Sequence, residues 1–216
     1  MKIKYSINRI TKRAINFYNY RIKKFFYIYH FSKKKIKFDW EKTNHLRIKV
    51  INNLINKTEK RRYLEIGCDL NQVFDKIYAN KKVGVDPERG GNVRSTSDIF
   101  FESNSQIFDV IFIDGLHEYE QIRRDITNSL KFVDINGFIV VHDLLPRTWL
   151  EEHVPRLAST WCGDVWKIAF DLKKTQSLNF DLLLIDFGLG VISKKSDNVE
   201  LFYDKHEKKN FNYLVD

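Results

Sequence analysis

The segment FDVIFIDGLHEYE, residues 108–120, constrains the fold of this chain more than any other part of the sequence. Its apolar run from Val110 to Ile113 stops abruptly at Asp114-Gly115, and a histidine follows at position 117. An unbroken apolar run bounded by a turn is typical of a strand buried on both faces of a parallel sheet. Ligands of open α/β sheets bind just beyond the carboxyl ends of such strands. The segment therefore predicts either a functional acid–imidazole pair or a helix-capping aspartate beside a solvated histidine.

Beyond residue 62 the sequence alternates short apolar runs with segments of helical periodicity. Strands are expected at residues 63–66, 82–85, 108–113, 137–141, 180–185 and 190–193. Helices are expected at residues 41–56, 71–79, 97–103, 118–133 and 147–159, the fourth ending at an Asn136-Gly137 C-cap signal. This alternation favours a doubly wound α/β sheet with parallel strands. Because only residues 186–189 separate the last two strands, no crossover helix fits there, and the sheet should end in an antiparallel strand.

Positive charge is concentrated at the start of the chain. Residues 1–38 contain twelve Lys and Arg residues and no acid, which leaves 25 basic and 28 acidic residues in the remainder. A nucleic-acid-binding body usually carries its own basic face, so no nucleic-acid partner is expected. The apolar residues of this segment recur at helical spacing and predict a basic amphipathic helix. Such a helix packs on its own domain or on a second subunit, or contacts a membrane surface peripherally.

The two cysteines, Cys68 and Cys162, form neither a disulfide framework nor a zinc-binding spacing. No stretch approaches the roughly 20 apolar residues that a membrane span requires. A reducing interior is the default environment for such a chain. We therefore expect a cytoplasmic protein, with peripheral membrane contact as the alternative.

Two strand ends carry features of an adenosine site. The first strand ends in YLEIGCDLNQ, where Glu65 and Gly67 stand in a nucleotide-binding turn that lacks the G-x-G-x-x-G pattern. The missing glycines disfavour a dinucleotide, whereas acids at the turn suit a cationic or zwitterionic ligand. The second strand ends in VGVDPE, and its Asp86 lies 19 residues after Gly67, close to the spacing of a ribose-binding acid. The alternative for Asp86 is a turn-capping role before Pro87.

A second acid–imidazole pair ends the strand GFIVVHDLLP, at His142 and Asp143. Adjacent parallel strands would bring Asp114 and Asp143 to the same edge of the sheet. Two neighbouring carboxylates repel each other unless one is protonated or a cation bridges them. Oxygen ligands suit Mg²⁺, Ca²⁺ or Mn²⁺, and an added imidazole extends the choice to Fe²⁺ or Zn²⁺. The alternative is that Asp143 caps the next turn and His142 is a satisfied strand-end histidine.

With these motifs the chain resembles the class I S-adenosylmethionine (SAM)-dependent methyltransferases, in particular bacterial members associated with glycan and secondary-metabolite genes. The resemblance covers about residues 63–194 and rests on YLEIGC, VGVDPE, STSDIFF, FDVIFIDGLHEYEQIRRDI and GFIVVHDLLPRT. It implies a Rossmann-like, doubly wound, seven-stranded sheet whose last strand is antiparallel. The implied organisation is an N-terminal helical segment and linker (1–38), a methyltransferase domain (39–194) and a polar, loosely held tail (195–216).

The resemblance also implies roles for individual residues. Glu65, Gly67 and Cys68 would line the methionine end of SAM, Asp86 would hold the ribose, and Asp98 would lie near the adenine amine. Asp114 would border the cofactor, and its D-x-x-H spacing to the expected base, His117, resembles that of metal-dependent sugar O-methyltransferases. The expected ligands of Mg²⁺ or Mn²⁺ are Asp114, His142 and Asp143. Where this chain has His142, the family often has an acid.

The implied reaction is methylation of a hydroxyl group on a saccharide or a glycosylated small molecule. Segments 147–156 and 161–166, which contain Trp149, Trp161 and Trp166, are expected to line the acceptor pocket. Two alternatives stay open from the sequence. The first is a methyltransferase of an amine or phenol, and the second is a non-catalytic adenosine-binding or assembly module.

Overall fold

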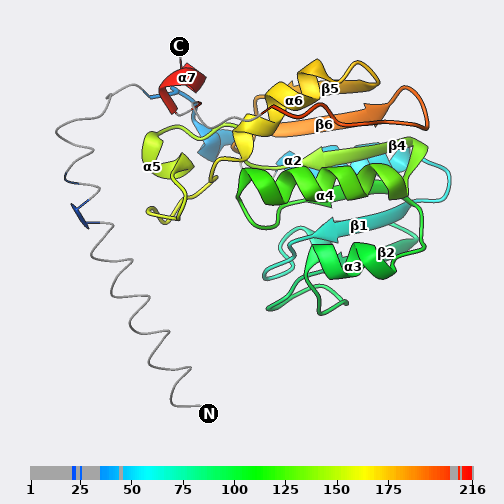
Figure 1. Cartoon of the computed structure of the whole chain (residues 1–216). Coiled ribbons are helices and arrows are strands. Elements are labelled where there is room, and N and C mark those ends of the chain that lie inside the picture. Colours follow the sequence, from blue (N-terminus) through cyan, green and yellow to red (C-terminus); the bar gives the residue numbers. More distant parts are fainter. Residues whose placement is uncertain are drawn as a thin grey trace.

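A six-stranded mixed sheet forms the centre of the molecule (Figure 1). The computed structural model describes residues 21–22, 25, 35–43, 46–204, 209 and 211–215, so most of the expected N-terminal helix lies outside the described residues. The strands are β1 (Arg62–Ile66), β2 (Lys81–Val85), β3 (Phe108–Ile113), β4 (Val133–Val141), β5 (Leu178–Leu183) and β6 (Leu189–Lys194). Their order is β2-β1-β3-β4-β6-β5. The first four are parallel and β6 is antiparallel to both neighbours, which confirms the doubly wound fold and the final hairpin.

The expected seventh strand is not formed within the part of the chain that the structure describes. The stretch between β2 and α3 (Ser97–Ser103) makes a single bridge, from Val85 to Val93. Gly90 and Gly91 adopt φ of +68° and +61°, and the amides of Asn92 and Val93 both donate to the carbonyl of Gly84. The segment therefore turns back on β2 instead of extending beside it.

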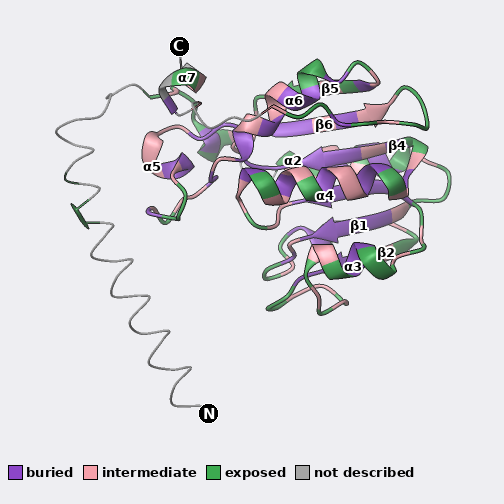
Figure 2. Ribbon diagram, viewed as in Figure 1, coloured by how far each residue is buried: buried purple, intermediate pink, exposed green. Residues whose placement is uncertain are grey.

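Helices cover both faces of the sheet (Figures 1 and 2). On β3, Ile111 and Ile113 share a core with α4 (Tyr119–Phe132), whereas Val110 and Phe112 share a second core with α2 (Leu46–Asn56). Every residue of β3 is buried, because neither face meets solvent. The apolar run from Val110 to Ile113 thus belongs to a central strand of the sheet.

Several expected helices are shorter than predicted. Residues 71–79 form only the 3₁₀ turn η2 (Phe74–Lys76), since Asp69 and Asn71 adopt positive φ and interrupt any helix there. The helix expected at 147–159 is reduced to α5 (Trp149–Glu152). The helix expected to end at Asn136-Gly137 ends at Phe132, and Gly137 lies inside β4. A Cβ at Gly137 would stand 2.6 Å from the Asp109 carbonyl oxygen, so close packing rather than capping requires this glycine.

Four short helical elements were not predicted, or not as separate elements. They are η1 (Trp40–Thr43), η3 (Val165–Lys167), α6 (Ile168–Lys174) and α7 (Phe211–Val215). Figure 1 shows α5 beyond the arrowheads of β1 and β4, with α7 beside it. The segment before α6 is therefore placed over the carboxyl edge of the sheet.

The described part of the C-terminal segment is packed rather than loosely held. Leu201 and Phe211 are buried. The amide of Phe202 donates to Thr175 Oγ1 at 3.0 Å, and the amide of Phe211 donates to Glu152 Oε1 at 3.2 Å. The prediction of a polar, loosely held tail stays a prediction for the segment as a whole, in which single apolar residues anchor an otherwise polar stretch. Among the described helices, none has the length and apolar character needed to cross a bilayer.

Candidate active site

A cavity of about 660 Å³ opens at the carboxyl ends of β1, β2 and β3. This volume lies in the range of small-molecule sites. The residues predicted to contact the cofactor all line it, namely Glu65, Gly67, Cys68, Asp86, Asp98 and Asp114. His117 lines it as well. The structure thus brings these side chains together, while their roles toward SAM stay predictions.

The turn after β1 requires glycine at its first position. Gly67 adopts φ of +84°, and a Cβ there would stand 2.2 Å from the Asp114 carbonyl oxygen. The amide of Asp114 donates to the Ile66 carbonyl at 2.8 Å. This close approach joins the turn to the end of β3 and leaves the cavity open above it.

Asp86 joins two turns at the floor of the cavity. Its Oδ2 accepts hydrogen bonds from the amides of Cys68 and Asp69, and its Oδ1 accepts from those of Glu88 and Arg89. Burial raises the pKa of this carboxyl, but these hydrogen bonds outweigh burial and lower the pKa below its usual value. The capping role considered from the sequence is therefore present, and a ribose hydroxyl would share oxygens that are already engaged.

Glu65 is, with Asp125, one of the two most deeply buried acids on the cavity wall, at 1% exposure. Burial raises its pKa to about 8; the hydrogen bond that Tyr63 Oη donates to it, 2.5 Å long, opposes this shift and the negative charge of Asp114 adds to it. A neutral carboxyl at this depth becomes favourable to ionise when a cationic ligand lies beside it.

Asp98 lies at the opposite side of the cavity, in the first turn of α3. Thr96 caps that helix through its side chain, which accepts from the Ile99 amide at 3.4 Å. The Asp98 carboxylate is 3.4 Å from Arg124 Nε and from Gln121 Nε2. It is therefore held at the cavity rim by α4.

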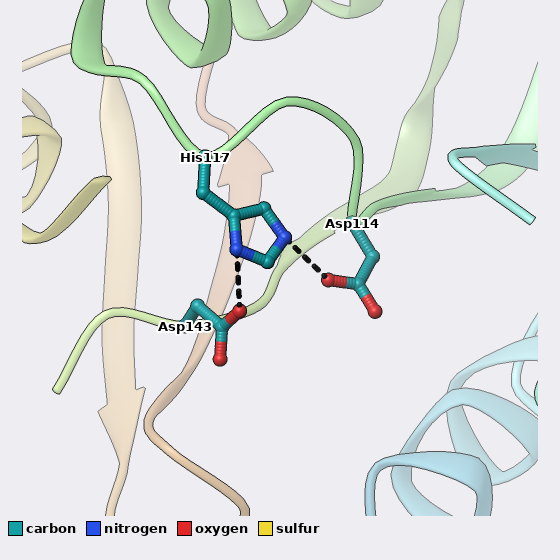
Figure 3. A group of neighbouring side chains, drawn as sticks. All are labelled: Asp114, His117 and Asp143. Carbon is teal, nitrogen blue, oxygen red and sulfur yellow. Dashed lines mark ion pairs between the residues drawn. The ribbon is translucent and has the colours of Figure 1, made fainter. Parts of the chain in front are cut away.

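Asp114, His117 and Asp143 form a compact group that could hold a metal ion (Figure 3). Each offers one ligand atom, and the three atoms lie within 4.8 Å of one another. His117 stands between the two carboxylates, with Nε2 3.4 Å from Asp114 Oδ1 and Nδ1 3.1 Å from Asp143 Oδ2. Two carboxylate oxygens and an imidazole nitrogen are a donor set that suits Mn²⁺ or Zn²⁺ and can also serve Mg²⁺.

His142 lies behind this group. Its Nδ1 is 3.1 Å from Asp114 Oδ1, while its Nε2 is buried, has no hydrogen-bond partner among the described residues and lies 3.8 Å from Asp186 Oδ1. Asp186 in turn pairs with Arg47 at 2.5 Å. The compact group thus contains His117 as its imidazole and not the expected His142, whose metal-binding role stays a prediction.

The two imidazoles compensate the two carboxylates. Burial lowers the pKa of His117, but the charges of Asp143 and Asp114 outweigh it and raise the pKa to about 9. The same carboxylates raise the pKa of His142 well above its usual value against the effect of burial. Burial also opposes ionisation of Asp114, yet His142 and His117 hold its pKa well below normal. Two positive charges therefore occupy the neighbourhood where a divalent cation would act.

Loops distant in sequence complete the site. Trp161 and Arg156 line the cavity, as expected for the segments around them, whereas Trp149 and Trp166 do not. The sequence did not indicate Arg47, Gln121 or Asp125, which also line it. In the sequence each of these residues is only a charged or polar residue within a helix. Such residues are common on exposed helices as well, so they do not indicate a site.

Comparison with known proteins supports this description. Residues 55–144, less than half of the chain, match the family model described as a methyltransferase domain. An uncharacterized protein of Acanthamoeba polyphaga mimivirus is 27% identical, and the alignment covers 53% of this chain and 66% of that protein. The chain therefore spans just under two thirds of the length of this curated relative.

Solved structures share the fold at low sequence identity. A methyltransferase of Podospora anserina, bound to SAH, is 17% identical with a TM-score of 0.51, and the match covers 82% of this chain and 94% of that one. An O-methyltransferase of Bacillus cereus in complex with SAH is 12% identical with a TM-score of 0.50, covering 70% and 82%. The family model indicates a methyltransferase domain at residues 55–144, and the solved structures share the fold of this chain.

Proposed function

We propose that this chain transfers the methyl group of SAM to a hydroxyl of a saccharide or a glycosylated small molecule, with help from a divalent cation. The observation that carries the proposal is the Asp114–His117–Asp143 group, of which Asp114 and His117 line the cavity that contains the Gly67 turn. Cofactor and acceptor would meet where the carboxyl ends of β1 and β3 adjoin.

Asp114 and Asp143 are the residues that would hold the cation. The expected third ligand is His142, whose Nδ1 lies 3.1 Å from Asp114 Oδ1 and 3.4 Å from Asp143 Oδ1. When bound, the cation lowers the pKa of the acceptor hydroxyl. The donor set supports this fit, because the buried carboxylate of Asp143 and the partly buried carboxylate of Asp114 repel each other unless positive charge lies beside them.

His117 is the residue that would take the hydroxyl proton. Its Nδ1 lies 2.8 Å from the Trp161 carbonyl oxygen, and because a carbonyl can only accept, Nδ1 carries the proton. Nε2 is left as the nitrogen that can accept a proton. In the transfer step the new C–O bond forms as the C–S bond breaks, the sulfur keeps the bonding electron pair, and the hydroxyl proton moves to His117 Nε2.

The charge balance of the site agrees with this role. With a pKa of about 9, His117 is protonated at neutral pH and cannot act as a base while the two carboxylates are otherwise uncompensated. A cation on Asp114 and Asp143 would cancel the charges that raise this pKa. Cation binding and base function would therefore depend on each other.

The test begins with calorimetric titration of the full chain with SAM, and absence of binding would contradict the enzyme assignment. Turnover with a panel of glycosides, phenols and amines then identifies the acceptor class. We expect EDTA to abolish turnover of the glycosides and Mn²⁺ to restore it. Full activity in EDTA would refute the cation, and turnover of amines or phenols alone would favour that acceptor class.

His117→Ala separates a proton acceptor from a metal ligand. A base that does not bind the cation gives a variant with slow turnover and unchanged Mn²⁺ affinity, measured by calorimetry. A ligand role gives a variant that has lost both. Full turnover in His117→Ala would exclude either role.

A further inference from the structure

A four-residue loop, Trp161–Asp164, encloses His117. It lies beyond residues 55–144, the part that matches the methyltransferase-domain family, and it separates the short helix α5 from η3. Trp161 and Gly163 contact His117, the thiol of Cys162 lies within electrostatic reach of Asp143, and Asp164 contacts the start of α4. These interactions are of different kinds, so the position of the loop does not depend on a single contact.

Trp161 fixes the plane and one nitrogen of the His117 ring. The two rings stack with centroids 5.2 Å apart and planes 24° apart. The Trp161 carbonyl oxygen lies 2.8 Å from His117 Nδ1. The indole is held in turn, because its Nε1 donates to the carbonyl of His153 at 2.8 Å.

Gly163 packs directly on the backbone of His117. It adopts φ of +63°, and a Cβ at this position would stand 1.7 Å from the His117 carbonyl oxygen and 2.8 Å from its Cβ. No side chain fits in that space. The amides of Cys162 and Gly163 both donate to the Glu151 carbonyl, which anchors the loop to α5.

Cys162 and Asp164 extend the contacts to either side of His117. Burial raises the pKa of the Cys162 thiol well above its usual value, and the negative charge of Asp143 adds to this rise. Asp164 Oδ1 accepts from the amide of Tyr119 at 2.7 Å, at the start of α4. The loop therefore contacts His117 and the start of α4, and it lies within electrostatic reach of Asp143.

We propose that the Trp161–Asp164 loop is a positioning element that selects Nε2 of His117 as the reactive nitrogen and aims it at Asp114 and the cavity. The backbone carbonyl of Trp161 accepts a hydrogen bond from the Nδ1–H group of His117. The ring stack and the Gly163 contact fix the orientation of the ring. A hydrogen bond from one imidazole nitrogen to a backbone carbonyl commonly sets which nitrogen serves a metal or a substrate. The role of Nε2 as a proton acceptor or a metal ligand rests on the proposed function. The orientation of the ring by the loop does not.

The first experiment detects the ring itself in cation-free protein. The full chain is labelled with ¹⁵N-histidine, and long-range ¹H–¹⁵N spectra are recorded, with the His117 ring signals identified by their loss in His117→Ala. We expect Gly163→Ala to shift both ring nitrogens of His117 and Trp161→Ala to shift them less, because the carbonyl remains. Trp161→Phe keeps the carbonyl and an aromatic stack and should restore the wild-type signals.

Trp149→Ala is the matched control, since Trp149 sits on α5 and contacts the ring of His153 edge-on instead of His117. A merely structural loop would give shifts in Trp149→Ala and Trp161→Ala alike. His117 signals that do not move in Gly163→Ala overturn the proposal. If Gly163→Ala does not fold by circular dichroism, Trp161→Ala against Trp161→Phe decides the question in the same way.

The second experiment measures Mn²⁺ binding by calorimetry in a double-mutant cycle. Loss of an outer partner of a ligand costs about 10- to 100-fold in metal affinity, and we expect this loss for Gly163→Ala if His117→Ala shows that His117 is a ligand rather than the base. In the His117→Ala background the same substitution should cost nothing further, because the loop acts through His117. Additive losses overturn the proposal. Wild-type protein that does not bind Mn²⁺ would refute the cation in the proposed function, while the ring signals still decide the role of the loop.

Discussion

The two halves of the carboxyl edge are built in different ways. The cofactor half consists of the turns after β1 and β2, where Gly67 and Asp86 are held by backbone hydrogen bonds. The reaction half consists of Asp114, His117 and Asp143, which are held by side chains and loops from other parts of the chain. A turn that fixes itself tolerates changes elsewhere in the molecule, whereas a group assembled from distant segments does not. The comparison predicts which substitutions separate cofactor binding from chemistry.

The largest effect is expected from Glu65→Gln in the cofactor half. The folded-state pKa of Glu65 is about 8 and its ordinary value is 4.5, so the folded protein binds this proton more tightly than the unfolded chain. The contribution of Glu65 to the stability of the wild-type protein is fully present below pH 4.5 and is lost as the pH rises through 8. The loss amounts to about 5 kcal/mol, from 1.36 kcal/mol per pKa unit. Urea unfolding at pH 5, 7 and 8.5 should show that the free energy of unfolding of the variant increases relative to that of the wild type as the pH rises.

A difference that does not depend on pH, or SAM binding that does not change, would contradict the role of Glu65. A free-energy difference between Glu65→Gln and wild type that is constant with pH would show that Glu65 is not buried as a neutral acid. Weaker SAM binding by the more stable variant would place the carboxylate beside a cationic group of the ligand. Unchanged SAM binding would remove Glu65 from the cofactor half.

Asp143→Asn tests the reaction half. Asp143 does not line the cavity, so SAM affinity should stay near the wild-type value. Since loss of an outer partner costs about 10- to 100-fold in metal affinity, loss of a ligand should cost at least about 100-fold. Mn²⁺ and SAM titrations of the same protein preparation measure both quantities. A variant that keeps Mn²⁺ affinity and loses SAM affinity would reverse our assignment of the two halves.

The sequence predicted the cofactor half better because its information is local. The apolar run of β3 and the turn signals after β1 and β2 lie within a few residues of the groups they position. The seventh strand was wrongly expected, since Gly90 and Gly91 turn the chain back before a strand can form. The reaction half depends on contacts across the chain: Trp161 is 44 residues from His117, and Arg47 is 139 residues from Asp186. No local pattern encodes such distances, so the sequence predicted His142 beside the two carboxylates, whereas the compact group contains His117.

Asp86→Asn should have a moderate effect on the cofactor half. The amide nitrogen that replaces one carboxylate oxygen faces two backbone N–H groups that lose their acceptor. Leaving such donors unsatisfied costs about 1–3 kcal/mol each in unfolding free energy. Thermal unfolding and SAM titration should therefore both change, with Mn²⁺ affinity preserved. Wild-type stability combined with weaker SAM binding would instead favour a direct ribose contact.

The smallest effect on either half is expected from removal of residues 1–34. The cut stops there because the amide of Ile36 donates to the Arg147 carbonyl at 3.1 Å, and Phe38 stacks on the buried Trp40, so the following residues belong to the domain. The removed segment carries eight Lys and Arg residues before the Lys33-Lys34 pair, with no acid. We expect SAM and Mn²⁺ affinities to stay unchanged, whereas the oligomeric state, measured by light scattering, or binding to anionic lipid vesicles should change. Loss of SAM affinity would show that this basic segment contributes to the cofactor half. Equal loss of Mn²⁺ affinity would mean that both halves depend on a segment that neither half contains.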